Sequence, residues 1–196
     1  MVSRAESAAA TRRALLDSAA ELLDEGGPEA VTLRDVAARA GVSRGAPYGH
    51  FADKESLLAA VAAEGWERLG DEIAAQQGSP SDRLRGALAV LVTIGRRCPH
   101  RYRQMFGAPA GEETGMLINA SCRAQEKFLA IVSELVDERD VHRYGGLLFT
   151  GVSGIIAAEL SGYFATGTWH TSADELVDTL VTTIADGRAQ RPVHPR

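Results

Sequence analysis

The sequence has few cysteines, no excess of basic residues and no long uninterrupted apolar run, and each shortage argues against a class of protein. Two cysteines, Cys98 and Cys122, in 196 residues cannot build a disulfide framework, so we expect both to be reduced. The first residues lack the apolar core of a secretory signal peptide, which favours a cytoplasmic protein. The most apolar stretch, residues 144–165, contains Glu159 and several glycines and serines. A buried helix is therefore favoured there, with a membrane span as the alternative.

Basic residues do not dominate the chain, which carries 21 of them against 26 acidic residues and a net charge of −5. The chain as a whole would therefore be repelled by phosphate, and any binding to nucleic acid must come from a local patch. Residues 30–54 are such a segment, because they hold four basic side chains and only two acidic ones.

Motifs for enzyme chemistry are also missing. We find no phosphate-binding loop, nucleophile elbow or pair of carboxylates at a useful spacing, so we expect no enzyme activity and no cofactor. His100, His142 and His170 lie far apart and lack metal-ligand spacing. Cys98 and His100 could bind a metal, but we interpret them as a surface pair at a helix end. The sequence therefore predicts no metal site.

Helical periodicity runs through almost the whole sequence, and no alternating strand pattern exceeds four residues. The chain is therefore expected to be all-α, with about nine helices separated by Gly, Pro and Ser signals. These helices are expected at residues 11–25, 32–40, 43–50, 53–77, 81–97, 100–107, 115–138, 141–166 and 172–188.

The same Gly, Pro and Ser signals predict the domain organisation. Residues 1–10 and 191–196 are expected to be flexible tails. Residues 11–52 are expected to form a three-helix domain, residues 53–77 a connecting helix, and residues 78–190 a larger helical domain. Residues 107–115 are expected to be a mobile loop.

The segment from residue 32 to residue 54 has the pattern of a helix-turn-helix. Gly41 accepts the positive φ that a tight turn between two helices requires, Val42 anchors the turn and Ser43 caps the next helix. That next helix has few large apolar residues, so it suits a DNA groove better than a protein core.

The full run TLRDVAARAGVSRGAPYGHFADKESLL resembles the DNA-binding signature of the TetR family of bacterial transcriptional regulators, and the match covers about residues 11–60. The resemblance implies that Phe51 is a core residue and that a further set contacts DNA. In that set Thr32, Tyr48, His50 and Lys54 contact phosphates, and Arg44, Gly45 and Ala46 face base edges. Lys54 in the first turn of a helix is unfavourable for the helix dipole, which independently suggests an anionic partner.

Two positions depart from the commonest family pattern. Gly49 lacks a side chain that often contacts DNA, so base readout rests heavily on Arg44. Pro47 removes an amide donor inside the recognition helix, where we expect a distorted first turn but not a broken helix.

Some of these residues also allow structural interpretations. Tyr48 could be a core aromatic residue, and His50 could cap a helix. Arg34 and Arg39 are interpreted as solvated surface residues more readily than as base contacts.

Dimerisation is expected from the last two helices. Gly154, Ala158 and Gly162 recur at four-residue spacing with Gly151 nearby, which would let two helices approach closely. The alternative is that this small-residue stripe packs within one subunit. The final helix offers an apolar face suited to a four-helix bundle across a twofold axis, with Leu176, Leu180 and Ile184 on it.

An effector pocket is expected in the C-terminal domain, with residues 107–115 as its lid. Apolar residues with a few polar groups are typical of ligand pockets. The scarcity of charge within the apolar helices favours an uncharged or lipophilic effector. The candidate lining residues are Trp66, Leu91, Ile94, Tyr102, Met105, Phe106, Met116, Cys122 and Phe128.

The resulting hypothesis is a homodimeric repressor that binds a palindromic operator in double-stranded DNA and is released by a small-molecule effector. The helix at 53–77 would transmit the change between the two parts of the chain. An activator of the same fold and a helical ligand-binding protein with a vestigial DNA-binding domain are the alternatives.

Overall fold

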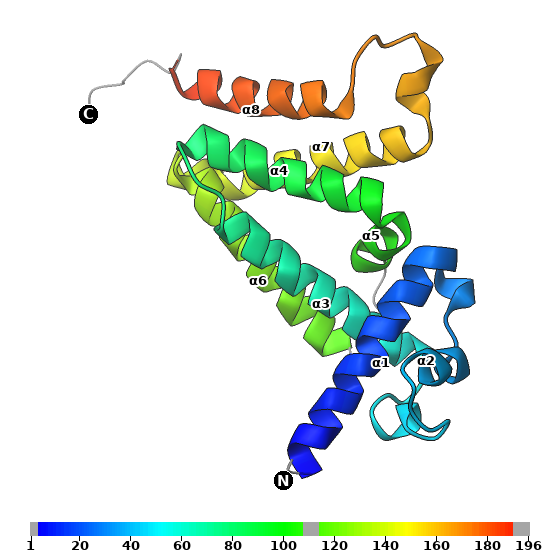
Figure 1. Cartoon of the computed structure of the whole chain (residues 1–196). Helices are drawn as coiled ribbons and strands as arrows, with labels where there is room; N and C mark the ends of the chain where they lie inside the picture. The colour runs from blue at the N-terminus through cyan, green and yellow to red at the C-terminus, as the bar shows by residue number, and fades with distance from the viewer. Residues whose placement is uncertain (1–3, 108–113, 190–196) are drawn as a thin grey trace. The chain divides into compact units, whose positions relative to one another are not determined.

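The computed structural model describes residues 4–107 and 114–189, and every regular element within these ranges is helical (Figure 1). The all-α prediction is confirmed. Eight α-helices and four short 3-10 turns occur in this part of the chain. They are α1 (Arg4–Gly26), η1 (Pro28–Ala30), α2 (Leu33–Arg39), η2 (Pro47–Gly49), α3 (Lys54–Ala74), α4 (Pro80–Arg97), α5 (Pro99–Phe106), α6 (Thr114–Ser133), η3 (Glu138–Asp140), α7 (Val141–Leu160), η4 (Tyr163–Thr166) and α8 (Ala173–Ala189).

The chain divides into two compact units that do not follow its order. Unit 1 contains residues 1–67 and 98–122, and unit 2 contains residues 68–97 and 123–196. Helices α3 and α6 each run from one unit into the other. The functional domain boundaries expected from the sequence are a different division and stay a prediction.

Unit 1 is built around α1. Leu15, Ala19 and Leu23 repeat at helical spacing, and all three are fully buried in a cluster that includes Val36 and Phe51. Burial of an apolar helical stripe is the main force that orders such a helix. Helices α2 and α5 both pack on α1.

Several expected helix boundaries were wrong. The structure continues α1 back to Arg4, so residues 4–10 are helical and not a flexible tail. The Thr11 hydroxyl donates to the carbonyl of Ser7 within the helix instead of capping it. Alanines at 8–10 favour helix, which explains the extension. Residues 190–196 and 108–113, which include most of the expected loop and lid, lie outside the described residues.

Unit 2 contains a layer in which α4, α7 and α8 pack on one another. Gly95 of α4 permits close approach to α7, because a Cβ atom there would lie 2.5 Å from Cγ2 of Ile156. The Arg96 guanidinium pairs with Glu159 of α7 at 2.7 Å and with Asp174 of α8 at 2.9 Å. The hydrogen bonds that Arg96 donates to these two carboxylates raise the pKa of Arg96 above its ordinary value. The three helices are thus joined by both packing and charge.

Within residues 4–107 and 114–189, no helix combines the length and apolar character that a membrane crossing requires. Nor do the described residues contain a group of three or more side chains able to hold a metal ion.

Candidate DNA-binding site and dimer face

The turn after α2 has the conformation that the sequence predicts. Gly41 adopts a left-handed φ of 67°, and the Val42 N–H donates to the carbonyl of Ala37 at 3.1 Å. A side chain at position 41 would be strained in this conformation. Val36 and Ala37 are fully buried, so the turn is fixed to the core of unit 1.

The segment that follows the turn, residues 43–50, is called the recognition segment here. It was expected to be a helix, and that prediction was wrong. Its backbone forms only turns and the 3-10 turn η2, with hydrogen bonds from Ala46 to Ser43 and from Gly49 to Ala46. Pro47 has no N–H to donate to the Ser43 carbonyl, and two glycines in the segment weaken any helix.

One face of the recognition segment is open. Tyr48 is 67% exposed, so its interpretation as a core residue is wrong. Gly45 and Gly49 are exposed, and a Cβ atom at either position would meet no atom within 4 Å. Arg44 is exposed, whereas Ala46 is half-buried. A large partner could therefore reach the backbone of this segment without a steric barrier.

The opposite side of the segment is anchored in the core. Pro47 is buried and Phe51 is only 2% exposed, which confirms Phe51 as a core residue. The Phe51 N–H donates to the carbonyl of Pro47 at 2.8 Å, and the half-buried His50 donates its backbone N–H to the same carbonyl at 2.9 Å. The recognition segment is thus held from behind while its outer face stays accessible.

Two phosphate-contact candidates lie at helix starts. Thr32 is exposed and caps α2, because its hydroxyl accepts from the Asp35 N–H at 3.1 Å. Lys54 is the first residue of α3 and is half-buried. Asp53 precedes it and accepts from the Ser56 N–H at 2.7 Å, and hydrogen bonds from Ser56 lower the pKa of Asp53. One N–H group at each helix start is thus already capped by a side chain, and Thr32 and Lys54 lie beside these caps.

Intramolecular carboxylates neutralise some cations of unit 1 and leave others. Arg39 binds Glu25 in a bidentate pair at 2.6 and 2.8 Å, which supports its interpretation as a surface residue. By contrast, Arg34, Arg44 and Lys54 make no ion pair within the described part of the chain. The positive charge of the helix-turn-helix is therefore concentrated on these residues.

The nine residues expected to line an effector pocket divide between the two units. Four of them gather in unit 1 and are called the aromatic cluster here. The Trp66 indole N–H donates to the Met105 carbonyl at 2.9 Å, and the ring of Phe106 lies 4.8 Å from Trp66 and 4.4 Å from Tyr102.

The remaining pocket candidates have other surroundings. Met116 is 44% exposed on α6, and Cys122 is also exposed. Leu91, Ile94 and Phe128 belong to unit 2, where Phe128 packs on Phe149 with ring centroids 6.0 Å apart. The nine-residue pocket stays a prediction.

Helix α5 connects the aromatic cluster to the end of α1. The Arg101 guanidinium forms a half-buried ion pair with Asp24 of α1. The His100 ring packs on Gly27, where a Cβ atom would lie 2.9 Å from Nδ1. The sequence analysis did not identify this connection, because residues 24 and 101 are remote in sequence.

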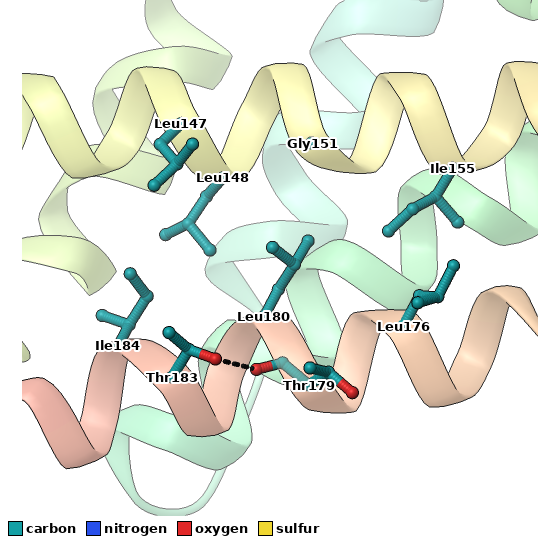
Figure 2. Close-up of a pocket in the computed structure, with 9 residues that line it drawn as sticks. All are labelled: Leu147, Leu148, Gly151, Ile155, Leu176, Thr179, Leu180, Thr183 and Ile184. Carbon is teal, nitrogen blue, oxygen red and sulfur yellow. Dashed lines mark hydrogen bonds between the residues drawn. The ribbon is translucent and has the colours of Figure 1, made fainter.

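The dimer candidates lie mostly on one apolar surface of unit 2. Between α7 and α8, a groove of about 330 Å³ is lined by Gly151, Leu176, Leu180 and Ile184 with their neighbours (Figure 2). A second groove of about 450 Å³ shares residues with the first and adds Gly154, Ala158, Tyr163 and Trp169. We call these two grooves together the α7–α8 face.

Gly162 lies beyond the end of α7 and lines neither groove, so the helical stripe does not reach it, and its place in a dimer interface stays a prediction. Helix α7 ends at Leu160, and Gly162 follows with a left-handed φ of 74°. A glycine with positive φ is the common way to end a helix, which is why the four-residue spacing stops at Ala158.

The α7–α8 face has apolar residues that the sequence analysis missed. Leu147, Tyr163 and Trp169 are about half-exposed, at 55%, 49% and 55%. Leu147 lies one helical turn before Gly151, so the helical spacing could have identified it. Tyr163 and Trp169 lie in the connection between α7 and α8, with ring centroids 5.7 Å apart.

The two threonine hydroxyls of α8 on this face are already satisfied. The Thr183 hydroxyl donates to the Thr179 carbonyl at 2.8 Å (Figure 2). The Thr179 hydroxyl donates to the Glu175 carbonyl, also at 2.8 Å. Burial of these hydroxyls would therefore leave no unpaired donor.

Comparison with known proteins supports this interpretation of unit 1. Residues 15–61 match the family model for bacterial regulatory proteins of the tetR family. The transcriptional regulator SrpR of Pseudomonas putida is 26% identical over 126 residues, which cover 64% of this chain and 59% of SrpR. The transcriptional regulator AcrR of Shigella flexneri is 33% identical over 85 residues, covering 43% of this chain and 40% of AcrR. The matches thus span less than two thirds of these two relatives.

A solved structure extends the similarity beyond the helix-turn-helix. A Rhodococcus protein of unknown function has a TM-score of 0.76 and 25% identity, covering 90% of this chain and 94% of its own. The motif and the relatives agree that residues 15–61 form a helix-turn-helix domain of the kind found in bacterial regulatory proteins of the tetR family.

Proposed function

We propose that the chain is a homodimeric transcriptional repressor that acts in the cytoplasm, binds a palindromic operator and leaves it when a small effector binds. The observation that carries the proposal is the open recognition segment next to cations without carboxylate partners. Such a surface combines backbone access for a groove with charge for phosphates. The proposal includes no catalytic step.

Base readout in this proposal rests on Arg44, with Gly45 and Ala46 allowing close approach. A guanidinium can donate two hydrogen bonds to the edge of a guanine. Thr32, Tyr48, His50 and Lys54 bind phosphates and set the register. Thr32 also caps α2, so in this proposal its phosphate contact is added to a structural role.

Dimerisation through the α7–α8 face supplies the second half-site. One recognition segment covers only a few base pairs, whereas two segments ~34–36 Å apart would read successive major grooves. The face suits a second copy, because it is apolar, its threonine hydroxyls are satisfied and its exposed side chains project beside hollows lined by glycine. In a twofold interface the same surface of each subunit must provide both the projecting side chains and the hollows that receive the partner's side chains.

Effector release needs a path from a ligand to the recognition segment, and in this proposal the path runs through unit 1. The aromatic cluster offers an apolar wall, and α5 carries the Arg101–Asp24 ion pair to the end of α1. A lipophilic molecule that displaces the side chains of the aromatic cluster would move α5. This movement would disturb the Arg101–Asp24 ion pair that α5 makes with α1. Linkage requires the reverse effect too, so operator binding should alter the cluster.

This reverse effect can be measured with Trp66 fluorescence in a Trp169→Phe background, which leaves Trp66 as the single tryptophan. Saturation with operator should shift the emission, and Asp24→Asn should reduce that shift. An unchanged emission spectrum at full occupancy would argue against this path while leaving DNA binding intact.

The experiment that tests the main proposal is fluorescence anisotropy on duplexes from immediately upstream of the gene, against random duplex, over a salt series. Wild type should bind the upstream duplex tightly, with a steep salt dependence. Arg44→Ala should lose ~1–3 kcal/mol for each half-site on the operator alone. Lys54→Ala should weaken both duplexes alike and reduce the salt slope by about one per subunit.

Arg39→Ala is the matched control, because Arg39 lies in the same motif but is paired with Glu25. It should leave both affinity and slope close to wild type. Equal weak binding of wild type to every duplex would overturn the proposal. Equal losses for Arg44→Ala on operator and random DNA would overturn the base-contact assignment.

A further inference from the structure

A cleft of about 220 Å³ lies between α6 and α7, and all of its lining residues belong to unit 2. We call it the α6–α7 cleft. One wall of it is aromatic, because the rings of Phe128 and Phe149 meet edge to face with centroids 6.0 Å apart. Phe128 is only 2% exposed and Phe149 is half-buried, so this wall is part of the packed interior. None of the lining residues belongs to the proposed DNA-binding site or to the α7–α8 face.

Two consecutive glycines of α7 also line the cleft, and only one of them has a packing reason. A Cβ atom at Gly145 would overlap Cδ2 of Leu129, so this glycine lets α6 and α7 approach closely. Gly146 is exposed, and a Cβ atom there would meet no atom within 4 Å. A glycine inside a helix lowers helix stability relative to alanine. At Gly146 this loss leaves open space beside the backbone, which a larger side chain would fill.

Two exposed polar side chains that line the cleft have no partner of their own. Neither the Gln125 amide nor the His142 imidazole makes a hydrogen bond or an ion pair within the described part of the chain. Other polar side chains of α7 differ, because the hydroxyls of Thr150 and Ser153 each donate to a carbonyl of their own helix at 2.8 Å. The cleft therefore combines an aromatic wall with hydrogen-bonding groups that a ligand can use.

The size and charge of the cleft indicate the class of ligand. An apolar cavity of ~150 Å³ accepts benzene, so a cleft of about 220 Å³ has room for one ring with a small substituent. Among the described residues, no Asp, Glu, Lys or Arg side chain lines it, so a charged ligand would lack a counter-ion. A hydroxyl group on the ring can donate and accept hydrogen bonds, which suits both an amide and an imidazole.

We propose that the α6–α7 cleft binds a neutral one-ring aromatic molecule with a hydroxyl group, that is, a phenol. Its ring packs on Phe128 and Phe149 beside Gly146, and its hydroxyl bonds to Gln125 and His142. The proposal does not rest on DNA binding, because the cleft contains none of the residues assigned to that function.

A ¹⁹F NMR titration of 4-fluorophenol with the full chain tests the proposal. Wild type should shift and broaden the fluorine resonance until one site per subunit is filled. Gly146→Leu should abolish this binding, because leucine would fill the cleft. Gln125→Leu and His142→Leu should each weaken binding ~2–10-fold, since each removes one hydrogen bond to the hydroxyl. The charged analogue 4-fluorobenzoate should bind more weakly than 4-fluorophenol.

Gly154→Leu is the matched control, because it makes the same substitution on the same helix outside the cleft. It should keep the wild-type affinity for 4-fluorophenol, since the cleft lies within one subunit. Thermal melting checks that each variant is folded, and if Gly146→Leu is not, the double variant Gln125→Leu/His142→Leu is judged by the same titration.

Three results would overturn the proposal. The first is a wild type without saturable binding. The second is a Gly146→Leu variant that binds like wild type, or a loss of binding in Gly154→Leu, which would place the phenol on the α7–α8 face. The third is tighter binding of 4-fluorobenzoate than of 4-fluorophenol, which would contradict a cleft for neutral ligands.

Discussion

Replacement of Gly154 by leucine should separate the dimer from the fold of the subunit. Gly154 is exposed on α7, and a Cβ atom there would meet no atom of its own chain within 4 Å. The folded subunit can therefore accept Gly154→Leu, and helix propensity even favours it by ~1 kcal/mol. Residue 154 lines the α7–α8 face, so the same side chain would enter the hollow that a second copy needs.

The size of the effect follows from the symmetry of the interface. Each added leucine overpacks its site at a cost of ~1–3 kcal/mol. A twofold interface contains two such sites. The dimer should therefore weaken by ~2–6 kcal/mol, or roughly 30-fold to more than 10,000-fold in Kd.

Sedimentation equilibrium over a dilution series measures this Kd directly, and thermal melting monitors the subunit. Gly146→Leu is the matched control, because Gly146 is also exposed on α7 with no atom within 4 Å of a Cβ atom. It lines a different groove, toward Gln125 and Phe128 of α6. If Gly154→Leu dimerises as tightly as wild type, or if Gly146→Leu dissociates equally, the α7–α8 face is not the dimer interface.

Three further predictions concern stability and are checked by denaturation. Gly95→Ala should destabilise the chain by ~1–2 kcal/mol despite better helix propensity, because its Cβ would overlap the stiff side chain of Ile156; a stabilised variant would contradict the packing. Trp66→Phe should cost ~1–3 kcal/mol, since it leaves a buried carbonyl at the end of α5 without its donor; an unchanged midpoint would mean that another donor replaces the indole. Hydrogen bonds from Ser56 lower the pKa of Asp53 below its ordinary value of 3.8 in the folded state, so its contribution is present above that pH and is lost as pH falls below it. Asp53→Asn should therefore lose less stability than wild type when the pH is lowered from about 5 to about 2. An acid transition identical to that of wild type would contradict this.

The fold could be predicted from the sequence where local signals were strong. The α1 stripe of Leu15, Ala19 and Leu23 and the turn at Gly41 were predicted, because apolar spacing and a required positive φ are local properties. The start of α1 was misplaced, since an alanine-rich run without a cap gives no clear boundary.

The recognition segment shows where such signals compete. The family motif predicted a helix across residues 43–50, whereas Pro47 and two nearby glycines oppose one. Sequence reasoning gave more weight to the motif, and the structure shows that the local preferences decided the backbone. The charges at Arg44 and Lys54 were identified, but the neutralisation of Arg39 by Glu25 depends on tertiary contact.

Contacts between remote segments could not be predicted. Residue 12 meets residue 51, and residue 24 meets residue 101, only because the fold brings the segments together. The same holds for Tyr163 and Trp169, which are ordinary aromatic residues in sequence and become part of an apolar face in the structure.

The threonine hydroxyls of α8 have a consequence for partner choice. Because Thr179 and Thr183 direct their hydrogen bonds into their own helix, the surface of α8 on this face offers a partner little directional polar contact. Hydrogen bonds and charges usually reject wrong partners, since a mismatch leaves them unpaired. On this face the discrimination depends mainly on shape, above all on whether the partner has hollows that accept the exposed Tyr163 and Trp169 side chains. A change in their size would alter which chains can pair, with little effect on how each chain folds.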